Sequence, residues 1–192
     1  MKKLTKYQLT KVSKNLDNYF NIASNEDITN GLQWYKQANA ICNDIAIQYN
    51  TTTFIASGVI SALSPRNKWD KNIIDAYAVF EAIKNNVEPA DLKVSTFHTN
   101  KFKAFAIANG LIEITTDSLK TYSFCQNIAH LNNDFITVDV WHLRACFNKT
   151  MASVGTLAYE QLRKLTLKKA NEVGMNGFEY QAIVWNSVKT NF

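Results

Sequence analysis

Apolar residues recur three and four positions apart along most of the chain, which is the spacing of helices that bury one face. Only 6 glycines and 2 prolines interrupt the 192 residues, so long helices with short connections are expected. No alternation of strand and helix patterns occurs, which argues against parallel α/β architectures. The pattern predicts an all-α protein with helices over 6–22, 29–49, 73–86, 100–109, 117–131, 139–147, 156–173 and 178–190.

Residues 54–63, with the sequence FIASGVISAL, are apolar on almost every side. This run predicts a fully buried helix, although a buried strand would show the same pattern. The segment that follows, SPRNKWDKN over 64–72, is polar and carries a tryptophan, and we interpret it as a joint between helices. A second loop is expected over 87–99, around Pro89.

The charge of the chain restricts the class of partner. The formal net charge is +5 and the isoelectric point is about 9.0, which suits a polyanionic partner such as nucleic acid. No stretch approaches the ~20 apolar residues of a membrane span, and no apolar run follows the basic N-terminus as in a signal peptide. We therefore expect a soluble, cytoplasmic protein without a membrane partner.

Cysteine and histidine spacing gives no metal or cofactor motif. The odd number of cysteines excludes a fully paired disulfide framework, and no CxxC pair occurs. Free and buried thiols are therefore expected at the three cysteines, Cys42, Cys125 and Cys146. No metal and no cofactor are expected, because the three histidines are too scattered to form a ligand set: His98, His130 and His142.

The densest group of candidate chemical residues lies in 120–144, KTYSFCQNIAHLNNDFITVDVWHLR. Helical spacing places four of them on one face: Lys120, Phe124, Asn127 and Ile128. Asp139 follows an apolar extended stretch and begins the next helix, where backbone N–H groups and the helix dipole would keep its carboxylate ionised. On spacing alone, the favoured interpretation of Asp139 is an ordinary N-cap, and Lys120 is a solvated lysine.

The joint 64–72 has two interpretations. As a nucleic-acid contact, its three cations would meet phosphates, Trp69 would stack on a base and Asn67 would hydrogen-bond to a base edge. The candidate DNA contacts of the joint are Ser64, Arg66, Asn67, Lys68 and Trp69, with Lys71 as the third cation. As a purely structural element, it is a polar connection with Trp69 packed against its own domain.

The run 120–144 resembles the helix-hairpin-helix DNA glycosylase superfamily, which includes endonuclease III and the 8-oxoguanine and adenine glycosylases. Lys120–Thr121 stand at the lysine and threonine that follow the hairpin, and Val138–Asp139–Val140 stand at the catalytic aspartate. Three further residues continue into the next helix much as in the 8-oxoguanine branch: Trp141, His142 and Arg144. The separation of Lys120 from Asp139 is close to that of the superfamily.

Segments on both sides of 120–144 also resemble the superfamily, but some of its characteristic residues are missing. Residues 54–76 resemble the helix and loop that fill the vacated base space, and 99–110 resemble the segment before the hairpin, so the match spans roughly 50–150. The hairpin glycines are missing, since 114–119 reads ITTDSL, and the iron–sulfur cysteines are absent. The chain is thus similar to a divergent, phage-type branch that acts on modified bases. Its final helix, with Gln181 and Trp185, looks like that branch as well, although Trp185 is also a candidate core residue.

The resemblance implies one glycosylase-like domain over 1–192, with two helical lobes around a DNA-binding cleft. The first lobe would cover about 30–150, and the termini, 1–29 and 151–192, would complete the second. A base flipped out of double-stranded DNA would be excised with Asp139 as catalytic carboxylate and Lys120 as a candidate Schiff-base lysine. The other substrate contacts would be Asn127, Trp141, His142 and Gln181. No obligate protein partner is expected.

Two alternatives keep the same fold. The missing hairpin glycines motivate the first, a phage-type enzyme that modifies a flipped base without breaking its glycosidic bond. The second is a DNA-binding module without catalysis, whose affinity would fall steeply with salt concentration.

Overall fold

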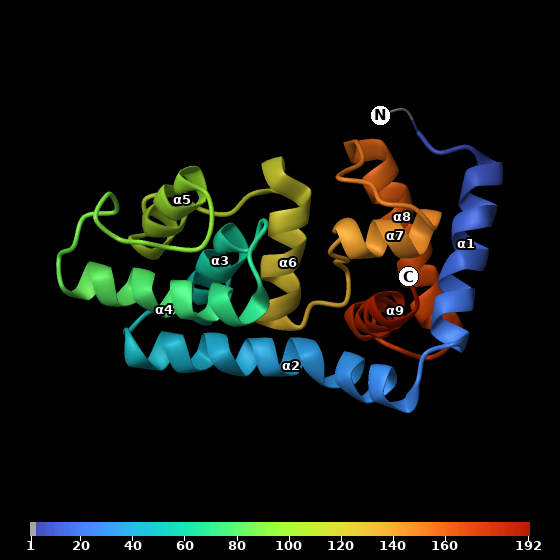
Figure 1. Cartoon of the computed structure of the whole chain (residues 1–192), viewed down its shortest axis with the longest axis horizontal. Helices are drawn as coiled ribbons and strands as arrows, with labels where there is room; N and C mark the ends of the chain where they lie inside the picture. The colour runs from blue at the N-terminus through green and yellow to red at the C-terminus, as the bar shows by residue number, and fades with distance from the viewer. Residues whose placement is uncertain (1–2) are drawn as a thin grey trace. The chain divides into compact units, whose positions relative to one another are not determined.

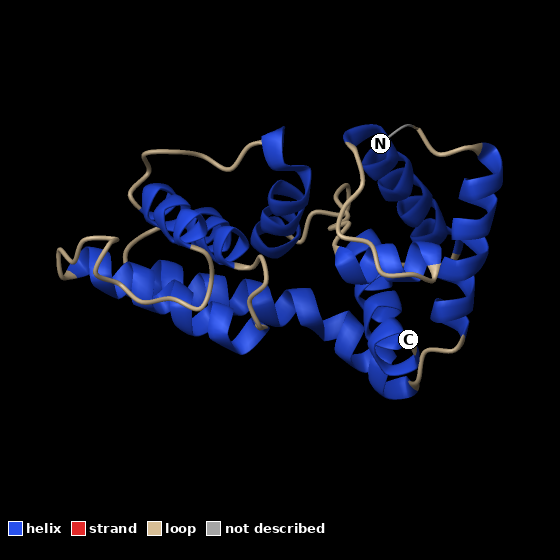
Figure 2. Cartoon of the chain, turned by 45° about the horizontal axis from the view of Figure 1, so that its top comes forward, coloured by secondary structure: helices blue, strands red, loops and turns tan. Residues whose placement is uncertain are grey.

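The computed structural model describes residues 3–192, and every regular element in this part of the chain is helical (Figure 1, Figure 2). The all-α prediction is therefore confirmed. The elements are α1 (Lys6–Asn21), α2 (Asn25–Gln48), α3 (Thr53–Leu63), α4 (Trp69–Lys84), α5 (His98–Ala108), the 3₁₀ turn η1 (Thr116–Ser118), α6 (Leu119–His130), α7 (Val140–Phe147), α8 (Thr156–Glu172) and α9 (Gly177–Asn191).

The chain divides into two compact units. One, which we call the discontinuous unit, is made of Met1–Gln37 and Leu131–Phe192, and the other, the inserted unit, is Ala38–His130. Helix α2 contributes residues to both. The boundaries differ from the lobes expected from the resemblance, because 131–150 belongs with the terminal helices rather than with the preceding segment.

Helix α3 forms the centre of the inserted unit and contacts α4, α5 and α6. All eight residues from Ala56 to Leu63 are buried, so the prediction of a fully buried helix is confirmed for 56–63, whereas Phe54 and Ile55 in its first turn are partly exposed. Of the two buried serines of this helix, Ser57 donates its hydroxyl to the Cys125 carbonyl at 2.8 Å, whereas the Ser61 hydroxyl is buried without a hydrogen-bond partner. An apolar run without a polar face thus forms a helix because other helices cover it on all sides from Ala56 onward.

The discontinuous unit is a bundle in which α1 packs on α7, α8 and α9, while α9 also packs on α7 and α8. Its core contains the buried side chains Val12, Leu16, Tyr35, Ile136, Leu143, Leu162, Tyr180 and Ile183. Gly31 in α2 permits a close approach to α9. A Cβ atom at Gly31 would lie 2.6 Å from the backbone nitrogen of Ile183, so only glycine fits at this contact.

Two helices, α2 and α4, begin four residues earlier than their patterns predict. Helix α2 begins at Asn25, after Ser24 and Asp27 exchange hydrogen bonds in the manner of a capping box. Helix α4 begins at Trp69, and its N-cap residue Lys68 makes no side-chain cap hydrogen bond. The interpretation of 64–72 as one continuous joint is therefore wrong for 69–72, which form the first turn of α4.

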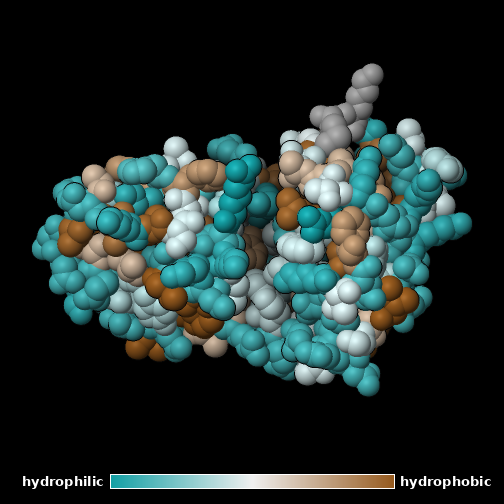
Figure 3. All heavy atoms as spheres, viewed as in Figure 1, coloured by the Kyte–Doolittle hydropathy of each residue, from teal (hydrophilic) through white to brown (hydrophobic). Residues whose placement is uncertain are grey.

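The surface is mixed in character. Hydrophilic residues dominate the face drawn in Figure 3, with hydrophobic residues scattered among them. Among residues 3–192, no helix combines the length and apolar character needed to cross a membrane.

Candidate functional site

The candidate site is centred on Asp139, in the discontinuous unit. The preceding residues, Ile136 and Val138, are buried and hold the chain extended up to the start of α7. Asp139 is the N-cap of this helix, and its Oδ1 accepts hydrogen bonds from the backbone N–H groups of Trp141 at 3.1 Å and His142 at 2.8 Å. Both donors and the positive end of the helix stabilise a negative charge on this partly exposed carboxylate.

A buried hydrogen-bond network holds the segment in front of Asp139. The Tyr35 hydroxyl donates to Gln181 Oε1 at 3.1 Å, and Gln181 Nε2 donates to the Thr137 carbonyl at 2.9 Å. Burial, together with the nearby charge of Asp139, raises the pKa of Tyr35, so its hydroxyl stays protonated. Gln181 was predicted to contact substrate. It is instead 2% exposed and uses both ends of its amide inside the unit, so its observed role is to fix the backbone before Asp139.

Two cations of α7 and α9 lie against indole rings, and we call Trp141, Arg144, Trp185 and Lys189 the cation–indole cluster. The Arg144 guanidinium lies 4.2 Å from the centre of the Trp141 ring, and Lys189 Nζ lies 3.9 Å from that of Trp185. Although Lys189 is exposed as a residue, desolvation of its ammonium lowers its pKa, and the negative charge of Asp139 opposes this shift. Asp139 and Lys189 of the cluster therefore influence each other electrostatically.

Sequence reasoning proposed Trp141 but missed both cations as site residues. The available signal was the spacing of the pairs, Trp141 with Arg144 and Trp185 with Lys189, because residues three or four apart share a helix face. The cations extend the site from one carboxylate to a carboxylate flanked by positive charge and aromatic surface.

His142 was predicted as a DNA contact, and the structure corrects this. It is 0% exposed, and its Nε2 lies 3.0 Å from the Thr166 hydroxyl. That hydroxyl already donates to the Leu162 carbonyl, so it accepts from His142 and the imidazole proton lies on Nε2. His142 Nδ1 is buried without a partner, and burial lowers the pKa of the ring to about 4.

A pH-dependent loss of stability is expected from His142. Its pKa falls from 6.5 to about 4 on folding, so between these values the unfolded chain binds the proton and the folded chain does not. Stability should therefore fall as the pH drops from 6.5 to about 4, by about 3 kcal/mol from this group. Urea unfolding of the wild type and of His142→Gln between pH 6.5 and about pH 4 measures this loss of stability. Equal pH slopes for the two proteins would contradict the assignment.

The candidate residues of α6 lie in the inserted unit. Lys120 is the second residue of α6 and is partly exposed, whereas Asn127 is 0% exposed. The prediction of Asn127 as a direct DNA contact is therefore corrected, like the prediction for His142. A side chain without exposed surface cannot reach a ligand in this conformation. Lys120 and Asp139 thus fall in different units.

Two polar residues of 64–68 form hydrogen bonds within the protein, and two cations of the same segment are exposed. The Ser64 hydroxyl donates to the Ser61 carbonyl at 3.1 Å, and Asn67 Nδ2 donates to Asp75 Oδ2 at 2.9 Å. Arg66 and Lys68 are exposed, and the guanidinium of Arg66 lies 5.4 Å from the centre of the Phe97 ring. The cations of this segment are therefore its available surface for a polyanion.

Trp69 supports the structural interpretation of its position. It begins α4 and is only partly exposed, and its ring packs edge-on against Phe124 at 6.5 Å between ring centres. The indole is thus part of the packing between α4 and α6. Stacking on a base stays a prediction for the part of the ring that remains accessible.

A match over the full length of the chain establishes its family. Residues 1–192 match the family of unknown function DUF7178 from end to end. The protein belongs to this family. No curated protein and no solved structure matches the chain, so DUF7178 membership comes without an assigned activity.

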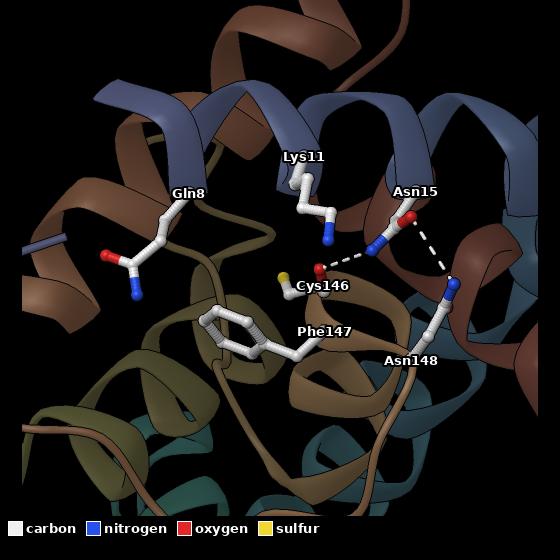
Figure 4. A pocket seen from close by; sticks show the side chains of 6 residues that line it. All are labelled: Gln8, Lys11, Asn15, Cys146, Phe147 and Asn148. Carbon is white, nitrogen blue, oxygen red and sulfur yellow. Dashed lines mark hydrogen bonds between the residues drawn. The ribbon is translucent and has the colours of Figure 1, made fainter. Parts of the chain in front are cut away.

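A separate pocket of this DUF7178 protein lies at the opposite end of α7 from Asp139. It measures about 180 Å³ and is lined from α1 by Gln8, Lys11 and Asn15 and from the end of α7 by Cys146, Phe147 and Asn148 (Figure 4). Asn15 Nδ2 donates to the Cys146 carbonyl at 2.9 Å, which satisfies the end of the helix. Burial raises the pKa of the Cys146 thiol, so the thiol stays protonated and this pocket offers no thiolate nucleophile.

The thiols and carboxylates of the DUF7178 chain do not suggest a metal site. Cys42, Cys125 and Cys146 are free and buried, as predicted. Burial raises the pKa of Cys42 to about 12 and that of Cys125 to about 11, so neither forms a thiolate near neutral pH. Within residues 3–192, no group of three or more histidine, cysteine, aspartate or glutamate side chains is arranged to hold a metal ion.

Proposed function

We propose that this DUF7178 protein is a DNA glycosylase that excises a modified or damaged base flipped out of double-stranded DNA. The observation that carries the proposal is the position of Asp139: a partly exposed carboxylate, fixed by two backbone donors at a helix start, within the Val-Asp-Val sequence that resembles the glycosylase signature. The proposal includes the two-lobed glycosylase architecture and a cytoplasmic location, where DNA is accessible.

Asp139 would act through its charge. Departure of the base leaves positive charge on the sugar, and a preorganised carboxylate stabilises that charge without having to reorient. The hydrogen bonds from Trp141 and His142 engage Oδ1, so they fix the plane of the carboxylate and stabilise its negative charge. Water then attacks the sugar carbon and yields an abasic site and the free base.

The deciding experiment is an excision assay on several DNAs. Duplex DNA with normal, damaged, hydroxymethylated or glucosylated pyrimidines is incubated with the protein and then heated in alkali, which breaks the strand at abasic sites. Alkali-dependent breaks on one class of substrate, together with release of the free base, are expected. Intact strands on every substrate would overturn the proposal.

Water rather than Lys120 is expected to be the nucleophile. Lys120 is partly exposed on α6 and belongs to another unit than Asp139, and an amine must lose its proton before it can attack the sugar. Borohydride, which reduces a Schiff base to a stable link, should therefore trap no covalent complex between protein and DNA. A trapped complex that disappears in Lys120→Gln would instead make Lys120 the Schiff-base lysine.

One observation favours a second candidate, the modification of a flipped base on the same fold. Residues 114–119 stand where the resemblance expects a glycine hairpin. Thr116–Ser118 form a 3₁₀ turn, α6 begins at Leu119, and none of these six described residues has a positive φ angle. Backbone N–H groups therefore do not cradle a phosphate there as a glycine hairpin would. Mass spectrometry of nucleosides after incubation would reveal a changed base without abasic sites.

A further inference from the structure

Arg144 and Lys189 converge on one indole ring. The Arg144 guanidinium carbon is 4.2 Å and Lys189 Nζ is 5.8 Å from the centre of the Trp141 ring. Arg144 lies also 5.3 Å from the centre of the Phe192 ring, and Lys189 lies on Trp185. Aromatic rings of α7, α9 and Phe192 thus hold two positive charges in the last turns of α7 and α9, and the negative charge of Asp139 acts on one of them, Lys189.

These two cations differ from three cations of the discontinuous unit that form ion pairs. Arg163 pairs with Glu160 at 2.8 Å, Lys169 with Asp17 at 2.9 Å and Lys36 with Glu179 at 3.0 Å. Within residues 3–192, neither Arg144 nor Lys189 forms an ion pair. Arg144 Nε is moreover buried without a hydrogen-bond partner. Two neighbouring cations repel each other, so their arrangement is favourable when an anion neutralises both.

We infer that Arg144 and Lys189 bind one phosphate of the DNA backbone, next to the nucleotide on which Asp139 acts. The inference rests on the proposed function for the identity of the ligand. A guanidinium held flat by stacking presents N–H groups that match phosphate oxygens, and the ammonium adds a point charge. The substrate anion that must approach Asp139 is the phosphate beside the target sugar, and these cations offset its repulsion by the carboxylate.

The test combines protein variants with a neutralised phosphate. Affinity is measured for short duplexes that carry a stable abasic analogue, with single linkages beside it replaced in turn by a neutral methylphosphonate. The variants are Arg144→Gln, Lys189→Gln and Lys189→Arg, and the control is Lys164→Gln, which removes an exposed charge from α8 of the same unit. Circular dichroism confirms that each variant is folded.

We expect Arg144→Gln and Lys189→Gln each to weaken binding about tenfold at low salt, since each removes a charged hydrogen bond. Each should also reduce the slope of log affinity against log salt by about 1. Lys189→Arg should retain affinity, and Lys164→Gln should match the wild type. At one linkage, the methylphosphonate should weaken DNA binding by the wild type about tenfold. At the same linkage it should weaken binding by the two glutamine variants little further, because these variants have already lost the contact.

Other results would overturn the inference. If the wild type excises a base and the two glutamine variants bind DNA as tightly as Lys164→Gln, the phosphate site is wrong and the proposed function stands. Weaker binding without coupling to any linkage would show that Arg144 and Lys189 only support the structure. A wild type that neither binds DNA nor excises a base would defeat the proposed function itself. If that protein still bound inorganic phosphate through Arg144, the ligand would be a free phosphate.

Discussion

Asp139→Asn should reduce base excision by about 10²-fold to 10³-fold or more, which is the range for removal of a preorganised electrostatic group. Asparagine caps helices as well as aspartate does, so Oδ1 at this position still accepts from the N–H groups of Trp141 and His142. The change therefore removes the charge and keeps the local structure. Single-turnover excision rates on the substrate found in the assay measure the effect.

Two controls separate charge from structure. Asp134→Asn removes an exposed carboxylate from the same connecting segment and should leave the excision rate unchanged. Asp139→Ala removes the cap as well as the charge, and should cost about 1 kcal/mol of folding stability that Asp139→Asn does not. If Asp139→Asn excised bases at the wild-type rate, Asp139 would be only the N-cap of α7, and the proposed mechanism would be wrong.

Gly31→Ala should destabilise the protein by roughly 2 kcal/mol, since overpacking at a close contact commonly costs that much. The added Cβ would lie 2.6 Å from the backbone nitrogen and 2.7 Å from the Cα of Ile183, so side-chain rotation cannot relieve the clash. The two helices must separate, and this loss exceeds the gain of about 1 kcal/mol in helix propensity. Urea unfolding measures the change in the free energy of unfolding.

Asn30→Ala is the matched control for Gly31→Ala. Asn30 is the preceding residue of α2 and is exposed, so its replacement should leave stability unchanged or slightly higher. Equal unfolding free energies for Gly31→Ala and the wild type would show that α2 and α9 can separate at this point without cost.

Helix type and position were largely predictable from the sequence, because burial sets the spacing of apolar residues. The FIASGVISAL run of α3 illustrates this, since all of Ala56–Leu63 is buried. The start of α4 was missed because Lys68 gives no capping signal, and a polar sequence resembles a loop. The start of α2 was detectable, because Ser24 and Asp27 have the spacing of a capping box.

The candidate site was predictable in its centre and not in its surroundings. Asp139 could be placed at a helix start because an apolar extended segment ends there. Whether His142 and Asn127 face solvent or the core could not be decided, since polar side chains occur in both places and only tertiary packing separates them. The proximity of Lys189 to Asp139 depends on how α9 packs against α7, which no local pattern encodes.

The split of the discontinuous unit sets the order in which the chain can fold during synthesis. The partners of α3 follow it directly, so the inserted unit can close through contacts between near neighbours while the ribosome is still at work. Helix α1 leaves the ribosome early, yet its partners α7, α8 and α9 are made last. Its apolar face, with Val12, Leu16 and Tyr19, stays uncovered meanwhile and is a surface for chaperones or for aggregation. The surroundings of Asp139 are thus assembled in the final step.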